Sequence, residues 1–166
     1  MADHYGPATI LVNCAGHTKP IPAANLDALD DALIDEMFAA NWRGTFATIR
    51  AFVPQMQATG DALIVNVSSI AANTGLGSNL AYAAAKAGID ALTKGLAKTL
   101  APKIRVLAVS PGVVDSPFVS GRDAQFNAKT GATRDVGSLA LTVHGVSNRI
   151  ATFGLWGVAG VLALTA

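Results

Sequence analysis

The chain has 166 residues, of which 51% are apolar and only 14% charged, with a formal net charge of +1. This length predicts one domain. A typical soluble domain carries roughly 25% charged residues, so the composition predicts elements buried on both faces or a surface that meets a partner. The low charge and few aromatic residues argue against nucleic-acid binding, and the single cysteine, Cys14, excludes a disulfide framework and a cysteine-based metal site.

Three short apolar segments predict buried strands at residues 8–16, 60–69 and 104–112. Between the first two, apolar residues recur at helical spacing from Leu33 to Val53, and Pro54 predicts that this helix ends nearby. Residues 80–100 are rich in alanine and predict a second long helix. Strands that alternate with helices indicate an α/β fold with a parallel sheet. Ligands of such sheets bind beyond the carboxyl ends of the strands.

Tyr82 and Lys86 lie four residues apart in the second helix and therefore share one of its faces. A free tyrosine has a pKa near 10, which a nearby ammonium lowers towards the range useful for acid–base catalysis. Ser69 leaves the end of the second strand and supplies a hydroxyl that can hold a carbonyl beside the phenol. Each piece has an ordinary alternative: a chance helical pair, a turn at Ser68 and Ser69, and a surface polar residue at Asn41.

Five segments in order resemble the short-chain dehydrogenase/reductase family: LVNCAG, AANWRGTF, IVNVSS, the YAAAK helix and IRVLAVSPGVVDS. Ser69 precedes Tyr82 by 13 residues, which is the family's usual spacing, whereas Ser68 precedes it by 14. The resemblance implies a partial doubly wound, Rossmann-like fold that corresponds to the C-terminal half of the family's domain. It also implies a cytoplasmic enzyme that interconverts a carbonyl and an alcohol with NAD or NADP.

The resemblance assigns roles to individual residues. Tyr82 would be the acid–base residue, Lys86 would lower its pKa and bind the nicotinamide ribose, Ser69 would polarise the carbonyl, and Asn41 would hold a water behind Lys86. Cofactor contacts would come from Asn13, Ala15, Gly16, Tyr82, Lys86, Pro111, Gly112, Val113 and Ser116. Cys14 stands where the family commonly has a second asparagine.

The two ends of the sequence depart from the family pattern. Residues 5–16 already correspond to the family's fourth strand, so the glycine-rich turn that holds the cofactor pyrophosphate is expected to be missing. Residues 75–80 (GLGSNL) begin Gly-x-Gly, but they follow the wrong strand and are interpreted as a loop on the substrate side. We therefore predict a truncated catalytic half-domain over residues 1–133 and a divergent tail over residues 134–166, with a shifted reading frame as one explanation.

Three functions remain open from the sequence. The first is an NAD(P)-dependent oxidoreductase acting on a small carbonyl or alcohol. The second is a non-catalytic remnant or dimerisation module that pairs two copies through the helices of Asn41 and Tyr82. The third is a membrane association through residues 150–166, which carry no charge but are short for a span. We also predict that the first strand exposes an apolar edge, which makes the isolated chain prone to associate.

Overall fold

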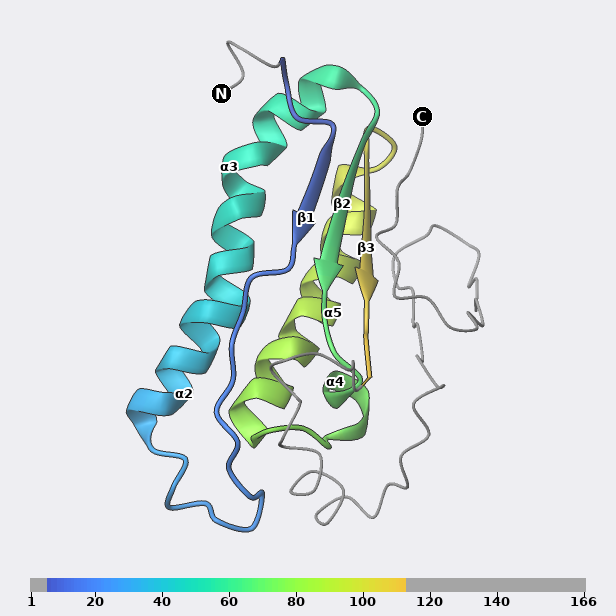
Figure 1. Cartoon of the computed structure of the whole chain (residues 1–166). Coiled ribbons are helices and arrows are strands. Elements are labelled where there is room, and N and C mark those ends of the chain that lie inside the picture. Colours follow the sequence, from blue (N-terminus) through green and yellow to red (C-terminus); the bar gives the residue numbers. More distant parts are fainter. Residues whose placement is uncertain (1–5, 113–166) are drawn as a thin grey trace.

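A computed structural model describes residues 6–112, and the structural statements below concern that part of the chain (Figure 1). The elements are, in order, β1 (Ile10–Asn13), α2 (Asp31–Phe38), η1 (Ala39–Arg43), α3 (Gly44–Thr59), β2 (Ala62–Val67), α4 (Ala71–Thr74), α5 (Leu80–Leu100) and β3 (Ile104–Val109). The three predicted strands and both long helical segments are confirmed. The short helix α4 was not predicted.

The three strands form a parallel sheet in the order β1–β2–β3, which confirms the predicted α/β architecture. Asn13 of β1 is in register with Asn66 of β2, and Asn66 is in register with Ala108 of β3. The carboxyl ends of all three strands therefore reach the same edge of the sheet. Strands of this kind need a crossover between them, and the helices α3 and α5 provide it.

The core lies between one face of the sheet and the two long helices. Ile49 and Met56 of α3 pack against Ile64 of β2 and Val106 of β3, and all four are at most 2% exposed. Leu92 of α5 packs on the same cluster, so α3 and α5 cover the same face. Burial of each such side chain contributes about 1.5–3 kcal/mol, which makes this interface the main source of stability.

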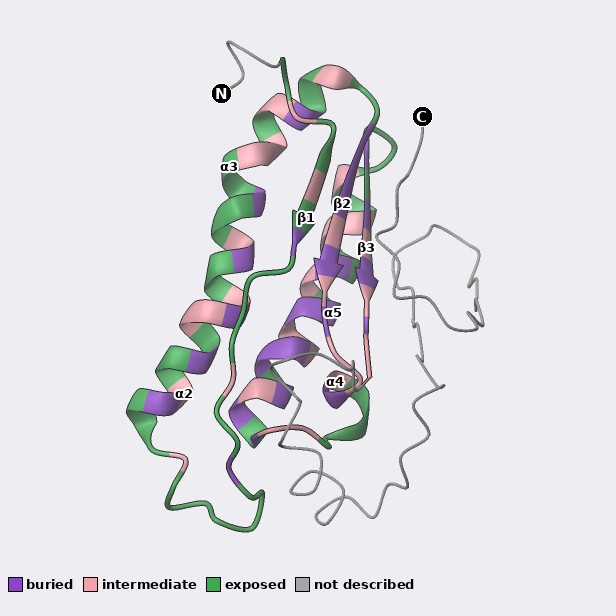
Figure 2. Ribbon diagram, in the orientation of Figure 1, coloured by how far each residue is buried: buried purple, intermediate pink, exposed green. Residues whose placement is uncertain are grey.

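The opposite face of β1 is open to solvent (Figure 2). Ile10 and Val12 are 52% and 57% exposed, although both are β-branched apolar residues of a strand. Their neighbours in register are Leu63 and Val65 of β2. Within residues 6–112, both long helices pack on the other face of the sheet, so the expected exposed apolar strand is present.

The first long helical segment is three consecutive pieces. It begins after Asp30, whose side chain accepts a hydrogen bond from the Leu33 N–H at 2.8 Å. A π-helical turn, η1, follows, and its wider winding is seen in the bond from the Gly44 N–H to the Ala39 carbonyl. The helix then continues through Pro54 to Thr59 and ends at Gly60, which has a φ of 79°. Pro54 is tolerated inside α3 because it lies on an exposed face, where water can satisfy the freed carbonyl.

The second long helix has the bounds that the sequence predicts. Its alanine-rich sequence is uninterrupted, and Asn79 caps it by accepting a hydrogen bond from the Tyr82 N–H at 2.7 Å. Residues 75–79 connect α4 to this cap. The Ile21 N–H donates to the Ser78 carbonyl at 2.6 Å, so this loop lies beside the segment that follows β1.

In the described range 6–112, no helix is both long enough and apolar enough to cross a membrane. The uncharged segment 150–166 and the proposed boundary between residues 133 and 134 lie outside the described residues.

Candidate active site

A cavity of about 290 Å³ opens beyond the carboxyl ends of the strands, where the sheet geometry predicts a ligand site. Segments from β1, β2, β3, η1 and α5 contribute to its wall. The lining residues are Cys14, Gly16, His17, Thr18, Asn41, Val67, Ser68, Ser69, Tyr82, Lys86, Pro111 and Gly112. The four residues with predicted catalytic roles therefore surround one cavity, although they are spread over 46 positions of the sequence from Asn41 to Lys86.

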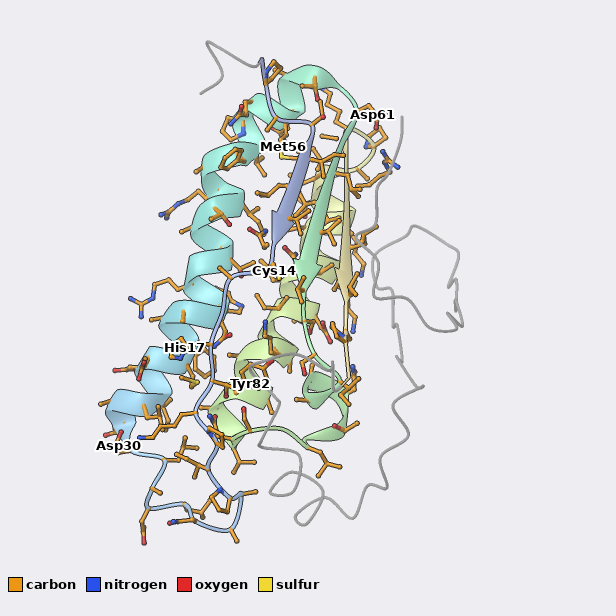
Figure 3. All side chains as sticks on the ribbon, viewed as in Figure 1. Cys14, His17, Asp30, Met56, Asp61 and Tyr82 are labelled. Carbon is orange, nitrogen blue, oxygen red and sulfur yellow. The ribbon has the colours of Figure 1, made fainter. Side chains whose placement is uncertain are left out.

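Tyr82 stands in the first turn of α5, with its backbone fixed by the Asn79 cap. Its side chain is partly buried (Figure 3). Burial raises the pKa of the phenol above its ordinary value, and an interaction with the Ser69 hydroxyl lowers that pKa by a smaller amount. The pKa of Tyr82 is therefore raised overall, whereas the sequence predicts that Lys86 lowers it. Desolvation of the phenolate is the larger effect, so the phenol is protonated at neutral pH.

Lys86 is 5% exposed, which is unusual for a lysine. Its Nζ donates a hydrogen bond to the Val67 carbonyl at 2.8 Å and lies 5.7 Å from the centroid of the Tyr82 ring. Burial lowers the pKa of the ammonium, while the neighbouring Asp90 carboxylate and Cys14 side chain act in the opposite direction. The amine is thus held by a main-chain oxygen within reach of the phenol.

The two serines at the end of β2 have different surroundings. Ser68 is 3% exposed, and its hydroxyl donates to the Lys86 carbonyl at 3.2 Å. Ser69 is less buried, and its hydroxyl accepts a hydrogen bond from the Ala71 N–H at 3.1 Å. Ser69 is also the serine that influences the Tyr82 phenol. This geometry agrees with the choice of Ser69 that the 13-residue spacing suggests.

Asn41 lies in the π-helical turn and is 1% exposed. Its Nδ2 donates to the His17 carbonyl at 2.9 Å and to the Met37 carbonyl at 3.0 Å. Its Oδ1 is buried without a hydrogen-bond partner in the described part of the chain. Because a buried amide oxygen normally accepts a hydrogen bond, this oxygen is a candidate acceptor beside the cavity wall.

Gly16 is the point at which these groups come closest. A Cβ atom at this position would lie 2.5 Å from Asn41 Oδ1 and 3.8 Å from Lys86 Nζ. Any larger residue at this position would therefore collide with the Asn41 side chain. The amide oxygen and the ammonium therefore border the same space beside the backbone of Gly16.

The predicted cofactor residues divide into four groups. Gly16, Tyr82, Lys86, Pro111 and Gly112 line the cavity. Ala15 is exposed but outside the lining. The side chain of Asn13 is turned into the core, where its Nδ2 donates to Asn66 Oδ1 at 2.9 Å and its Oδ1 accepts from Thr48 at 2.6 Å. The polar atoms of this side chain are therefore already used within the protein, and the predicted cofactor contact of Asn13 stays a prediction. Val113 and Ser116 lie outside the described residues.

Sequence reasoning missed three parts of the site. The Val67 carbonyl that holds Lys86 carries no sequence signal, because every residue has a carbonyl. His17 and Thr18 line the cavity, and only their position directly after Gly16 could have indicated this. Over residues 6–112, no group of three metal-binding side chains comes together, and Cys14 is an exposed free thiol.

Known proteins share both this sequence and this architecture. The family model of short chain dehydrogenases matches residues 1–126. The cis-4-hydroxycyclohexanecarboxylate dehydrogenase of Sinomonas cyclohexanicum is 37% identical over 140 residues, which are 84% of this chain and 55% of that enzyme. This chain spans about half the length of most of the curated relatives that it matches.

Solved structures give the same result. An NAD⁺-bound xylitol dehydrogenase is 30% identical with a TM-score of 0.69, over 80% of this chain and 50% of that one. The NADP-bound protein ElxO is 27% identical with a TM-score of 0.67, over 81% of this chain and 52% of its own. The family match covers most of the sequence and includes the four residues with predicted catalytic roles, all of which line the cavity. The chain belongs to the short-chain dehydrogenase/reductase family.

Proposed function

We propose that this protein is an NAD(P)-dependent oxidoreductase that interconverts a carbonyl and an alcohol, with Tyr82 as the acid–base residue. The observation that carries the proposal is the gathering of Tyr82, Ser69, Lys86 and Asn41 around one cavity at the carboxyl edge of a parallel sheet. Two solved relatives have NAD⁺ or NADP bound, and a nicotinamide cofactor of this kind supplies or accepts the hydride.

Tyr82 moves the proton in this proposal. Its pKa is raised by burial, so the phenol carries its proton at neutral pH and can donate it to the oxygen of a carbonyl that is being reduced. The Ser69 hydroxyl lies beside the phenol and can hold the same oxygen. The reverse reaction needs the phenolate, and the raised pKa makes this form scarce.

Lys86 and Asn41 would renew the proton and bind the cofactor. The Lys86 ammonium uses one N–H for the Val67 carbonyl, which leaves two further donors. The vacant lone pairs of Asn41 Oδ1 lie on the other side of the space beside Gly16. A water held between these atoms would be the first member of a relay that brings a proton from solvent to Lys86. Pro111 and Gly112 would lie against the nicotinamide of the cofactor, and Gly16 would lie towards its adenosine side.

A binding titration tests the proposal directly. We expect NADH or NADPH to bind saturably, with a change in cofactor fluorescence, and a Lys86→Met variant to bind at least tenfold more weakly. A Tyr82→Phe variant should still bind the cofactor but lose turnover of the trial substrate cis-4-hydroxycyclohexanecarboxylate or its ketone. Absence of saturable binding by both cofactors would contradict the proposal.

We also propose that two copies of the chain associate through η1, α3 and α5. Trp42 stacks on Phe46 with ring centroids 5.6 Å apart, and the Arg50 guanidinium lies 5.8 Å from the Phe46 ring. Trp42 reaches α5 at Gly88, where a Cβ atom would lie 2.8 Å from its ring. Trp42, Phe46 and Arg50 thus form an aromatic and cationic stripe along η1 and α3, and Trp42 meets α5 at Gly88. A stable dimer that binds neither NADH nor NADPH would favour the dimerisation module over the enzyme.

A further inference from the structure

Three consecutive residues at the end of β2 are each hydrogen-bonded to α5. Asn66 Nδ2 donates to Thr93 Oγ1 at 2.9 Å, the Val67 carbonyl accepts from Lys86 Nζ at 2.8 Å, and the Ser68 hydroxyl donates to the Lys86 carbonyl at 3.2 Å. Lys86 and Thr93 are seven residues apart, or about two helical turns, so they lie on the same face of α5. This face of α5 is therefore hydrogen-bonded to the end of β2 at two positions along the helix, Lys86 and Thr93.

The bond between Asn66 and Thr93 belongs to a longer series that crosses the core. The Thr48 hydroxyl of α3 lies 2.6 Å from Asn13 Oδ1, and Asn13 Nδ2 donates to Asn66 Oδ1 at 2.9 Å. At the far end, the Thr93 hydroxyl donates to the Ile89 carbonyl at 2.8 Å. Asn66 and Thr93 are both 0% exposed, so water does not compete for these bonds.

Apolar packing alone does not fix the position of α5 along the sheet. Contacts between aliphatic side chains have no preferred direction, and a small sliding of the helix changes the buried area little. A hydrogen bond has a narrow range of lengths, and a buried amide without a partner costs about 1–3 kcal/mol. The Asn66–Thr93 bond therefore opposes sliding of α5 more sharply than the surrounding core does.

We propose that Asn66 and Thr93 are positioning residues whose hydrogen bond sets the location of α5 along β2, and with it the placement of Tyr82 and Lys86 against Ser69. The catalytic meaning of this placement rests on the function proposed above. Neither side chain lines the cavity, so neither would touch a substrate.

The test compares two threonines of the same helix. In Thr93→Val the side chain keeps its shape but Asn66 Nδ2 loses its acceptor. Thr99→Val is the matched control, because the Thr99 hydroxyl makes the same kind of bond within the helix, to the Gly95 carbonyl at 3.0 Å, but is exposed and reaches no other element. Thr93→Ser restores a hydroxyl at the buried position.

The readout is the ionisation of the Tyr82 phenol, followed by NMR of tyrosine labelled at Cζ, over the pH range in which far-ultraviolet circular dichroism is unchanged. The chain has two tyrosines, and Tyr82→Phe identifies the signal. The titratable groups that share the cavity with the phenol are Lys86, Cys14 and His17, and all variants retain them. A change in the titration therefore reports a change in the position or the hydration of Tyr82.

We expect Thr93→Val to increase the ionisation constant of Tyr82 about twofold or more, since a loosened helix admits water to a phenol whose pKa is raised by burial. Thr99→Val and Thr93→Ser should match the parent. Equal ionisation constants of Tyr82 in folded Thr93→Val and Thr99→Val would overturn the proposal.

If Thr93→Val does not fold, Thr93→Ala is compared with Thr99→Val in the same way, because alanine leaves room for a water at Asn66. The measurement needs no cofactor, so failure of NADH and NADPH binding would affect the proposed enzyme and leave this result standing.

Discussion

Gly16 is the residue at which the site is most sensitive to a single added carbon. A Cβ atom there would lie 2.5 Å from Asn41 Oδ1, which is too close for a non-bonded contact, and Asn41 is held by two carbonyls through its Nδ2. Because Asn41 is fully enclosed, it has little freedom to move away. Gly95 offers the contrast, since a Cβ atom at that helical position meets nothing within 4 Å.

We therefore expect Gly16→Ala to destabilise the chain by about 1–3 kcal/mol through overpacking. Gly95→Ala should stabilise it by about 0.5–1 kcal/mol, because alanine loses less backbone entropy in a helix. Urea unfolding followed by circular dichroism measures both changes. Equal free energies of unfolding for the two variants would contradict the close contact between Gly16 and Asn41.

The buried carboxylate of Asp90 affects the pKa of Lys86. It follows Lys86 by one helical turn, is 4% exposed, and its Oδ1 has no hydrogen-bond partner within the described range. Burial lowers the pKa of Lys86, and Cys14 and Asp90 oppose that lowering. Replacement of the Asp90 carboxylate by a neutral amide removes the negative charge that raises the pKa of Lys86.

Asp90→Asn should consequently lower the pKa of Lys86 further. Between its lowered pKa and the ordinary value of 10.5, folded Lys86 binds fewer protons than unfolded Lys86, so stability rises with pH across this window. The substitution should extend this window to lower pH.

NMR titration of the Lys86 Cε, assigned with Lys86→Met, measures the midpoint of the Lys86 titration. Asp61→Asn is the control, since Asp61 pairs with Arg105 at 3.1 Å at the opposite end of β2 (Figure 3). An unchanged or raised midpoint in Asp90→Asn would contradict the role assigned to this carboxylate.

At the level of elements, the sequence predicted α5 well because its signals agree. The alanine-rich run has no breaker from Leu80 to Leu100, and Asn79 is a good capping residue directly before it. The strands were also predictable, since each is a short apolar run that ends at a turn. Tyr82, Lys86 and Ser69 then follow from their spacing on these elements.

Other features of the elements had no local signal. The π-helical turn η1 has no sequence signature, and its Asn41 side chain bonds to the His17 carbonyl, which lies 24 residues earlier in the chain. Pro54 is normally a helix breaker, yet α3 continues beyond it. The inward direction of Asn13 was partly readable, because the alternation of a strand places it on the same side as Leu11, which packs on the core. Its partners on β2 and α3 were not readable, because they depend on register and helix placement.

On the scale of the whole molecule, the described part of the chain is a sheet whose one face is covered by the helices α3 and α5. On the other face, the side chains of β1 are exposed to solvent. Ile10 and Val12 together form an apolar strip on β1, and β1 is an edge strand of the sheet. Such a strip combines unpaired backbone groups with exposed apolar side chains, which favours association between sheets. This surface differs from the aromatic stripe of Trp42 and Phe46 on the helices.

We expect the chain to associate increasingly with concentration through this strip. A double variant, Ile10→Thr and Val12→Thr, should reduce the association. Threonine keeps the β-branched shape that suits a strand and replaces the ethyl group of Ile10 and one methyl group of Val12 with a hydroxyl. The matched control is Leu26→Thr with Leu76→Thr, which removes apolar residues that are 66% and 57% exposed but lie outside the sheet. Sedimentation velocity over a range of concentrations measures the effect.

A dimer built on the helices would persist in both double variants as a single defined species. Association along β1 would instead produce a distribution of sizes, which only the β1 variant narrows. If the two double variants associate to the same extent, the edge of β1 is not the surface responsible.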